Sequence, residues 1–209
     1  MPENPSTPRR QSHNQQTVVE FFRWHVRVYG NDWRALGWQS RYTQFRRFAV
    51  LAEIGSLAHR RVLDVGCGLG DLYDYLEAEK IPVDYTGYDL LPDMVKRARK
   101  RFPQVHFEVY DILQGLGEER FDYILSSGAF NVNFGDNLSA VQQVIREMIT
   151  HSTYGVAINF LKRYPGASND PIFQYYEPQE MLTFCQMVCQ HARLRKGYLP
   201  NDFTLYLYP

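Results

Sequence analysis

The sequence predicts an α/β protein with a doubly wound, mostly parallel seven-stranded sheet, an antiparallel C-terminal hairpin strand and N-terminal helices. Three observations predict this fold class. From residue 61 onward, short apolar runs alternate with amphipathic helical patterns, and this alternation is typical of parallel strands joined by right-handed crossovers. Two further helical patterns precede the first apolar run. Two apolar runs close the chain around Pro-Asn-Asp at 200–202, which predicts a hairpin.

The 209 residues suit one domain with an appendage, and composition divides them into three parts. Residues 1–15 are rich in Pro, Ser, Asn, Gln and Arg and have almost nothing to bury, so we expect a disordered tail. Residues 16–57 hold the N-terminal helices, which we expect to cover a binding site. Residues 58–209 form the α/β domain.

Changes in apolar periodicity set the expected elements. Ser40 is a suitable N-cap, Pro92 suits the first turn of a helix, and Gly30 and Gly55 are suitable stops. The expected helices are 17–29, 42–54, 72–76, 92–102, 137–150 and 178–190. The expected strands are 61–65, 84–89, 105–110, 121–126, 154–160, 193–199 and 203–208.

Charge and cysteine content exclude several classes of protein. Lys plus Arg and Asp plus Glu each number 23, so the basic excess typical of nucleic-acid binders is absent from the sequence. Three cysteines without a C-x-x-C pair argue against a secreted disulfide framework and predict small buried side chains and no metal site. The sequence has no long apolar segment and no signal core, so we expect a cytoplasmic protein with no membrane partner.

The most informative stretch is VLDVGCGLGD at 62–71, in which Gly66, Gly68 and Gly70 lie between a strand and a helix. Glycines let a backbone turn sharply and approach a ligand closely. The dinucleotide fingerprint G-x-G-x-x-G would place its third glycine at position 71, where Asp71 stands. We interpret Asp71 as repelling a pyrophosphate, which disfavours a nicotinamide-dependent reductase and suits a ligand with cationic groups.

Acidic residues stand at the tips of three consecutive expected strands. Asp64 lies in the first, Asp89 ends the second and Asp111 follows the third. Asp89 can accept hydrogen bonds from a ribose diol, or it caps the next helix. Asp111 can bind an adenine amino group, with the Ile112 N–H on a ring nitrogen, or it caps a turn. Together the three tips predict a nucleoside site.

Four runs of this sequence resemble the successive motifs of class I S-adenosylmethionine-dependent methyltransferases, and the resemblance covers about residues 58–209. The runs are LDVGCGLG, GYD, VYDIL and FDYILSSGAFN. The resemblance implies a Rossmann-like fold and S-adenosylmethionine as cofactor, with S-adenosylhomocysteine as product. It implies that the glycine loop contacts the methionine part, that Asp89 binds the ribose and that Asp111 binds adenine. The implied cofactor contacts are Asp64, Gly66, Cys67, Gly68, Gly70, Asp89, Leu90, Asp111 and Ile112. The resemblance implies that Asp64 orders the loop and faces the ammonium group of the cofactor. It also implies that Cys67 contributes backbone atoms and that Leu90 and Ile112 flank the adenine.

The end of the fourth expected strand, SSGAFN at 126–131, lies where this family lines the path of the methyl group. It lacks the N-P-P-Y/F pattern, which disfavours a nucleobase or glutamine acceptor. Ser127 and Gly128, with Asn131, are the candidates near the methyl group, or they only shape the loop.

No catalytic base is assigned. His25, His151 and Tyr154 are candidates with structural alternatives. The segment from Tyr29 to Arg41, with Trp33 and Trp38, is expected to fold over the cofactor. Arg41 either holds the cofactor carboxylate or forms a surface salt bridge.

The long loop 163–176 is expected to act as a lid or binding loop. Its aromatic side chains contact either an acceptor or the core, and they are Tyr164, Phe173, Tyr175 and Tyr176. The basic run 96–101 is interpreted as a solvated helix face rather than a nucleic-acid patch.

These features predict an enzyme that transfers the methyl group of S-adenosylmethionine to a small-molecule acceptor. The alternatives are a protein methyltransferase and a noncatalytic S-adenosylmethionine-binding or interaction subunit. We expect a monomer or homodimer with no nucleic-acid partner.

Overall fold

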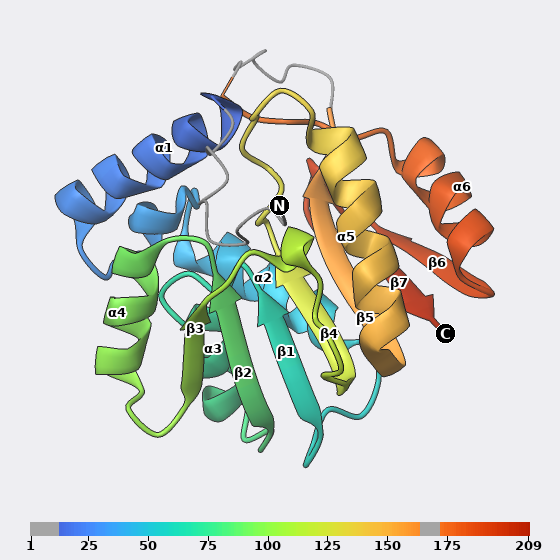
Figure 1. Ribbon diagram of the computed structural model, residues 1–209, viewed down its shortest axis with the longest axis horizontal. Coiled ribbons are helices and arrows are strands. Elements are labelled where there is room, and N and C mark those ends of the chain that lie inside the picture. The colour runs from blue at the N-terminus through green and yellow to red at the C-terminus, as the bar shows by residue number, and fades with distance from the viewer. Residues whose placement is uncertain (1–12, 164–171) are drawn as a thin grey trace, which may run out of the picture.

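A computed structural model describes residues 13–163 and 172–209, with a seven-stranded sheet in the order β3-β2-β1-β4-β5-β7-β6 (Figure 1). The first five strands along the chain are parallel, and β7 pairs antiparallel with both β5 and β6. This arrangement confirms the predicted fold class. The strands are β1 Arg61–Val65, β2 Asp84–Asp89, β3 His106–Val109, β4 Phe121–Ser127, β5 Ser152–Leu161, β6 His191–Lys196 and β7 Asp202–Tyr208.

Helices cover both faces of the sheet and bury two large apolar clusters. One cluster lies under α5 and α6, and the other lies under α2, α3 and α4. Because helices cover both faces, β1 and β4 are buried along almost their whole length. The helices are α1 His13–Tyr29, α2 Arg41–Ala52, α3 Asp71–Ala78, α4 Pro92–Arg101, α5 Asn137–His151 and α6 Pro178–Val188, with short 3-10 helices η1 Trp33–Leu36 and η2 Ile112–Gln114.

α1 and η1 lie at the edge where the parallel strands end, whereas α2 packs on one face of the sheet (Figure 1). Val26 of α1 and Ala35 of η1 are buried in a small cluster with Leu69 of the glycine loop and Met94 of α4. Apolar packing therefore fixes α1 and η1 over the carboxyl edge of the sheet. α1 begins at His13, inside the stretch expected to be a tail, and residues 1–12 lie outside the described residues.

Most element boundaries agree with the local signals. Ser40 caps α2, since its Oγ accepts from Thr43 N at 3.1 Å, and Pro92 occupies the first turn of α4. The final link runs over 197–201, which is longer than the three residues expected. Cys67, Cys185 and Cys189 are buried and free, as predicted. In the described part of the chain, no helix is both long enough and apolar enough to span a membrane.

Candidate functional site

The glycine loop and the tips of β2 and β3 meet at one edge of the sheet. The N–H groups of Gly66 and Cys67 donate to the carbonyl of Tyr88 at 2.7 and 3.0 Å. Tyr110 N, after β3, donates to the Asp89 carbonyl at 3.0 Å. The structure thus brings together the motif residues that the sequence placed on successive strands.

Neighbouring segments approach the glycine loop closely enough to exclude side chains. Gly66 and Gly68 have φ values of +77° and +55°, in the left-handed region that favours glycine. A Cβ at Gly66 would collide with that of Ala129, and one at Gly68 would lie 2.8 Å from Leu36 Cδ2. The loop is therefore held between the chain leaving β4 and the short helix η1.

Asp89 ties the glycine loop to the tip of β2. Its Oδ2 accepts from Gly68 N at 2.8 Å, and its Oδ1 accepts from Leu91 N at 2.9 Å. Burial raises the pKa of Asp89, and these two N–H donors oppose that rise. Each carboxylate oxygen has capacity for a further donor. Asp89 thus stabilises the turn after β2, and its oxygens can still accept hydrogen bonds from a ribose diol.

Asp111 lies beside this tip and caps η2, because its Oδ1 accepts from Leu113 N at 3.0 Å. Its Oδ2 makes no hydrogen bond to the described residues, so one oxygen can still bind a donor. Ile112 is buried, whereas Leu90 is 46% exposed at the end of β2. A polar atom and an exposed apolar side chain thus lie at adjacent strand tips.

Asp64 is a buried carboxyl group at the end of β1, only 2% exposed. Its Oδ2 accepts from the Tyr85 hydroxyl at 2.5 Å, and its Oδ1 has no partner among the described residues. Burial raises the pKa of Asp64 to about 7, opposed by the Tyr85 hydrogen bond and assisted by Asp89 and Asp71. This carboxyl group therefore has one oxygen available to a cationic ligand.

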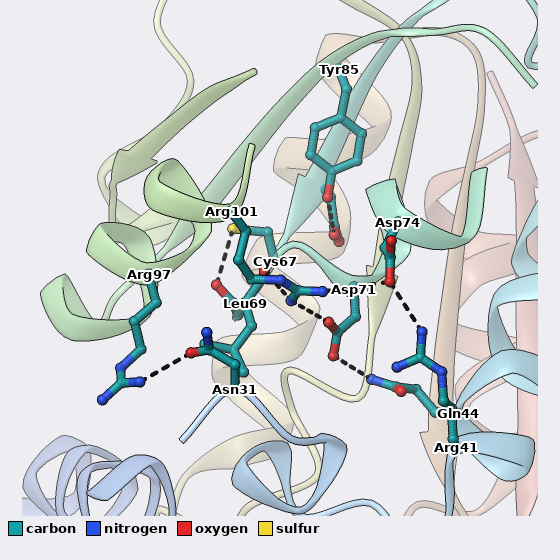
Figure 2. Close-up of polar contacts among 12 residues, drawn as sticks. Asn31, Arg41, Gln44, Cys67, Leu69, Asp71, Asp74, Tyr85, Arg97 and Arg101 are labelled. Atoms are coloured by element: carbon teal, nitrogen blue, oxygen red, sulfur yellow. Dashed lines mark hydrogen bonds and ion pairs between the residues drawn. The ribbon is translucent and has the colours of Figure 1, made fainter. Parts of the chain in front are cut away.

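Asp71 does not act as we interpreted it from the sequence. Its Oδ1 pairs with Arg101 Nη1 at 2.5 Å, and its Oδ2 accepts from Gln44 Nε2 at 2.8 Å (Figure 2). Arg101 also donates to the carbonyl of Leu69 at 2.7 Å. The interpretation that Asp71 repels a pyrophosphate is therefore wrong, because an internal ion pair compensates its charge.

The basic run at 96–101 is also more structural than predicted. Arg101 fastens the glycine loop, and Arg99 Nε donates to the Phe107 carbonyl at 2.8 Å. Arg97 Nη1 donates to Asn31 Oδ1 at 3.0 Å, which links α4 to the turn after α1 (Figure 2). This run joins elements of the site instead of forming only a solvated face.

Arg41 forms the surface salt bridge, the second alternative drawn from the sequence. Its Nη2 lies 3.1 Å from Asp74 Oδ2, and the side chain is 54% exposed (Figure 2). The structure thus gives no support to Arg41 as the group that holds a cofactor carboxylate.

The predicted site residues at the end of β4 and just after it have two different roles. Ser127 Oγ accepts from Asn159 Nδ2 at 3.4 Å, and Gly128, with φ of +71°, packs beneath the ring of Trp38. Asn131 is buried, and its Oδ1 accepts from Leu161 N at 3.1 Å. Ser127 and Gly128 therefore lie at the edge, whereas Asn131 shapes the loop.

Two of the three candidate bases lie at the wrong edge of the sheet. Ser152, at the start of β5, is in register with Phe121, the first residue of β4. His151 there contacts the Gly117 carbonyl at 3.0 Å, and the ring of Tyr154 packs under Arg60. The prediction that His151 or Tyr154 is the catalytic base is therefore wrong, because the site lies at the opposite ends of β4 and β5.

His25 lies on α1, at the correct edge. Its Nδ1 is 2.8 Å from the Phe21 carbonyl, which can only accept, so Nδ1 carries a proton. In the neutral ring Nε2 then keeps a free lone pair. The ring of Phe21 lies 6.3 Å from that of Phe173, so α1 contacts the end of the long loop.

The rest of that loop is only partly described. Tyr164 falls outside the described residues. Tyr176 is buried, and its hydroxyl donates to the Phe130 carbonyl at 2.8 Å, so it belongs to the core. The ring of Tyr175 lies 5.7 Å from the Arg163 guanidinium. Phe173 forms an isolated bridge with Val132.

Sequence reasoning missed a cluster around the start of α2. Arg47 Nε and Nη2 bind both carboxylate oxygens of Asp202 at 2.6 and 2.7 Å, with almost no exposure of either side chain. The Arg47 guanidinium also lies 4.7 Å from the Trp38 ring centroid. Only Trp38 lies close to the Ser40 cap in the sequence, and no local signal pairs Arg47 with Asp202, which is 155 positions away.

Comparison with known proteins identifies the family. The family model described as "Methyltransferase domain" matches residues 62–152. A protein of Mycobacterium tuberculosis, named "Putative methyltransferase Rv1506c", is 31% identical over 150 residues, covering 68% of this chain and 86% of that protein. The chain belongs to the class I S-adenosylmethionine-dependent methyltransferases.

Other proteins are similar to this methyltransferase over a shorter stretch or at lower sequence identity. The demethylmenaquinone methyltransferase of Chlorobaculum tepidum is 35% identical over 92 residues, covering 41% of this chain and 35% of that enzyme. The crystal structure of magnesium protoporphyrin IX methyltransferase from Synechocystis PCC 6803, with bound S-adenosylmethionine, superimposes with a TM-score of 0.64. It is 16% identical, covers 97% of this chain and 100% of its own, and thus supports the fold alone.

The residues of this methyltransferase fit its cofactor, S-adenosylmethionine. The glycine loop offers close backbone approach, Asp89 offers acceptors for a ribose diol, and Asp64 offers an unpaired oxygen for an ammonium group. The cofactor supplies an activated methyl group on a sulfonium. The protein supplies binding, orientation and exclusion of water.

We expect S-adenosylhomocysteine to bind more tightly as the pH rises through about 7. Below that pH, Asp64 is neutral and must lose its proton before it can hold the ligand's ammonium group. Binding then releases a proton, and the affinity falls by at most about tenfold for each pH unit below the pKa. Calorimetric titrations in buffers of different ionisation enthalpy measure this proton release.

Asp64→Asn is the matched variant for this prediction, because an amide at this position cannot titrate. Its affinity for S-adenosylhomocysteine is expected to be lower and nearly independent of pH between about 6 and 8. An unmodified protein that binds with the same affinity across this range, without proton release, would contradict the role of Asp64.

Proposed function

We propose that this methyltransferase transfers the methyl group to a small molecule bound at the carboxyl ends of β4 and β5, beneath α1. The packing of η1 and α1 over the glycine loop carries this proposal. Leu36 packs on Gly68, and Val26 is buried in one cluster with Leu69 and Met94. A cover this close to the cofactor loop favours a small acceptor over the surface of a folded macromolecule.

The same packing supports separate roles for the parts of the chain. We propose that the helices within 16–57 act as the cover and that 58–209 carries the cofactor site. The names of two similar enzymes support a small acceptor, since one concerns demethylmenaquinone and the other magnesium protoporphyrin IX. A net charge of zero favours neither nucleic acid nor an anionic surface as partner.

Two polar groups are our candidates for binding and activating the acceptor. Asn159 Oδ1 is buried without a partner in the described part of the chain, next to Ser127. A hydroxyl or amine of the acceptor would satisfy this oxygen. His25 Nε2 is the candidate that removes the acceptor proton, because its ring lies on the covering helix with Nδ1 already bound to Phe21. We therefore propose a hydroxyl or amine nucleophile.

Transfer of radiolabel from methyl-labelled S-adenosylmethionine tests this function. The purified protein is incubated with the low-molecular-mass fraction and, separately, with the protein fraction of a cell extract. We expect label in small organic products and little in acid-precipitated protein. Label in the protein fraction would favour a protein methyltransferase, whereas S-adenosylhomocysteine binding without transfer to either fraction would favour a noncatalytic subunit.

His25→Asn should slow transfer about 100-fold without weakening cofactor binding.

A further inference from the structure

The buried polar atoms that lack partners gather at the site. In residues 13–163 and 172–209, four buried side-chain atoms have no hydrogen-bond partner. They are Trp38 Nε1, Gln44 Oε1, Asp64 Oδ1 and Asn159 Oδ1. Leaving such a group unsatisfied costs about 1–3 kcal/mol. Four such groups in one region indicate that a ligand satisfies them.

The two strand residues among them face the same side of the sheet as α2. Val62 and Ala157 pack in the cluster that lies under α2. Alternate residues of a strand share a face, so Asp64 and Asn159, each two residues further on, face α2 as well. The orphaned atoms of Trp38 and Gln44 approach this face from α2 and the turn before it.

Two of the four atoms belong to residues beside the glycine loop, and a third belongs to Trp38, which packs on Gly128 next to the loop's neighbour Ala129. Asp64 precedes Gly66 by two residues, and Gln44 Nε2 is held by Asp71, the first residue of α3. A Cβ at Gly128 would lie 2.6 Å from Trp38 Cη2 and 3.3 Å from Cζ2, on the ring edge that leads to Nε1. The indole N–H therefore lies near the chain that leaves β4.

The indole is held firmly, and the neighbouring arginines are already engaged. Arg47 stacks on the Trp38 ring and is fixed by both oxygens of Asp202. Arg41 pairs with Asp74 instead of facing the loop. Apart from Asn159, the unpartnered atoms are one donor, Trp38 Nε1, and two acceptors, Gln44 Oε1 and the carboxyl oxygen Asp64 Oδ1.

We propose that Trp38, Gln44 and Asp64 bind the amino-acid end of S-adenosylmethionine. The Trp38 N–H donates to the cofactor carboxylate, while Gln44 Oε1 and Asp64 Oδ1 accept from the ammonium group. An amino acid zwitterion carries the matching acceptor and donors. The segment that covers the site thus also recognises the cofactor. This inference rests on the cofactor and is independent of the acceptor.

Two ligands that differ only at this end separate recognition from packing. S-adenosylhomocysteine carries the amino-acid end, and 5′-methylthioadenosine lacks it. Trp38→Phe removes the N–H and keeps an aromatic ring at position 38. It also removes the Cζ2 and Cη2 atoms that lie over Gly128, and this loss of packing affects both ligands alike. We expect its dissociation constant for S-adenosylhomocysteine to rise about tenfold or more, and that for 5′-methylthioadenosine to stay within about twofold. Trp24→Phe, at a side chain 55% exposed on α1, is the matched control and should change neither.

The outcomes distinguish the explanations without any acceptor present. Equal weakening of both ligands by Trp38→Phe would mean lost packing and would overturn the inference. Unchanged affinity for S-adenosylhomocysteine would also overturn it. If Trp38→Phe does not fold, Asp64→Asn is titrated with the same pair at pH 8. A selective loss for S-adenosylhomocysteine then supports the inference, and an equal effect on both ligands overturns it. A failure to methylate small molecules would leave these results unaffected.

Discussion

Arg47→Met is expected to lower the free energy of unfolding by about 3–5 kcal/mol, because it leaves the Asp202 carboxylate buried without its partner. The Arg47 and Asp202 side chains are 5% and 0% exposed. Removing one member of such a pair is far more costly than replacing both with apolar groups. Arg47 also stacks on Trp38 and donates to the Thr43 carbonyl, so the turn before α2 loses support as well.

Arg195→Met is the matched control for this prediction. Arg195 pairs with Glu53 at 2.9 Å, but the two side chains are 39% and 45% exposed. An exposed pair contributes about 0–1 kcal/mol. Urea unfolding of both variants measures the difference. If Arg47→Met costs no more than Arg195→Met, the Arg47–Asp202 pair does not stabilise the fold as the structure indicates.

Asp89→Ala is expected to weaken binding of S-adenosylhomocysteine about 100-fold or more. Asp89 lies at the tip of β2 with capacity on both oxygens for the ribose hydroxyls, and bonds to a charged acceptor contribute about 1.5–3 kcal/mol each. The alanine also leaves Gly68 N without its acceptor, which loosens the loop that carries the ligand. Calorimetric titration measures the change.

Asp93→Ala is the control, because Asp93 is an exposed acid in the first turn of α4. It should bind S-adenosylhomocysteine as the unmodified protein does, and both variants should retain the fold. Asp89→Asn keeps an acceptor but loses the charge, so an intermediate affinity is expected. An Asp89→Ala protein that binds as tightly as Asp93→Ala would show that this strand tip is not the ribose site.

Local signals predicted the sheet and its glycine loop well. The run 61–65 is stopped by Gly66, and its predicted limits match β1. The acids at the strand tips come together because parallel strands end at one edge. The same rule excludes His151 and Tyr154, since residues that begin a parallel strand lie at the opposite edge. That signal was present in the sequence and was misread.

The polar network around α2 was beyond local signals. Arg47 and Asp202 are 155 positions apart, and Gln44 and Asp71 are 27 apart. Their pairing depends on how α2 packs on the sheet, which periodicity does not specify. Asp71 was misinterpreted for the same reason, because its partner Arg101 lies 30 positions away in another helix.

A crystal structure of the protein with S-adenosylhomocysteine tests most directly the claim that one carboxyl edge binds the whole cofactor. The account predicts ribose hydroxyls on Asp89 and the amino-acid end between Trp38, Gln44 and Asp64. A ligand whose ribose lies away from Asp89, or whose carboxylate is held by Arg41, would contradict it.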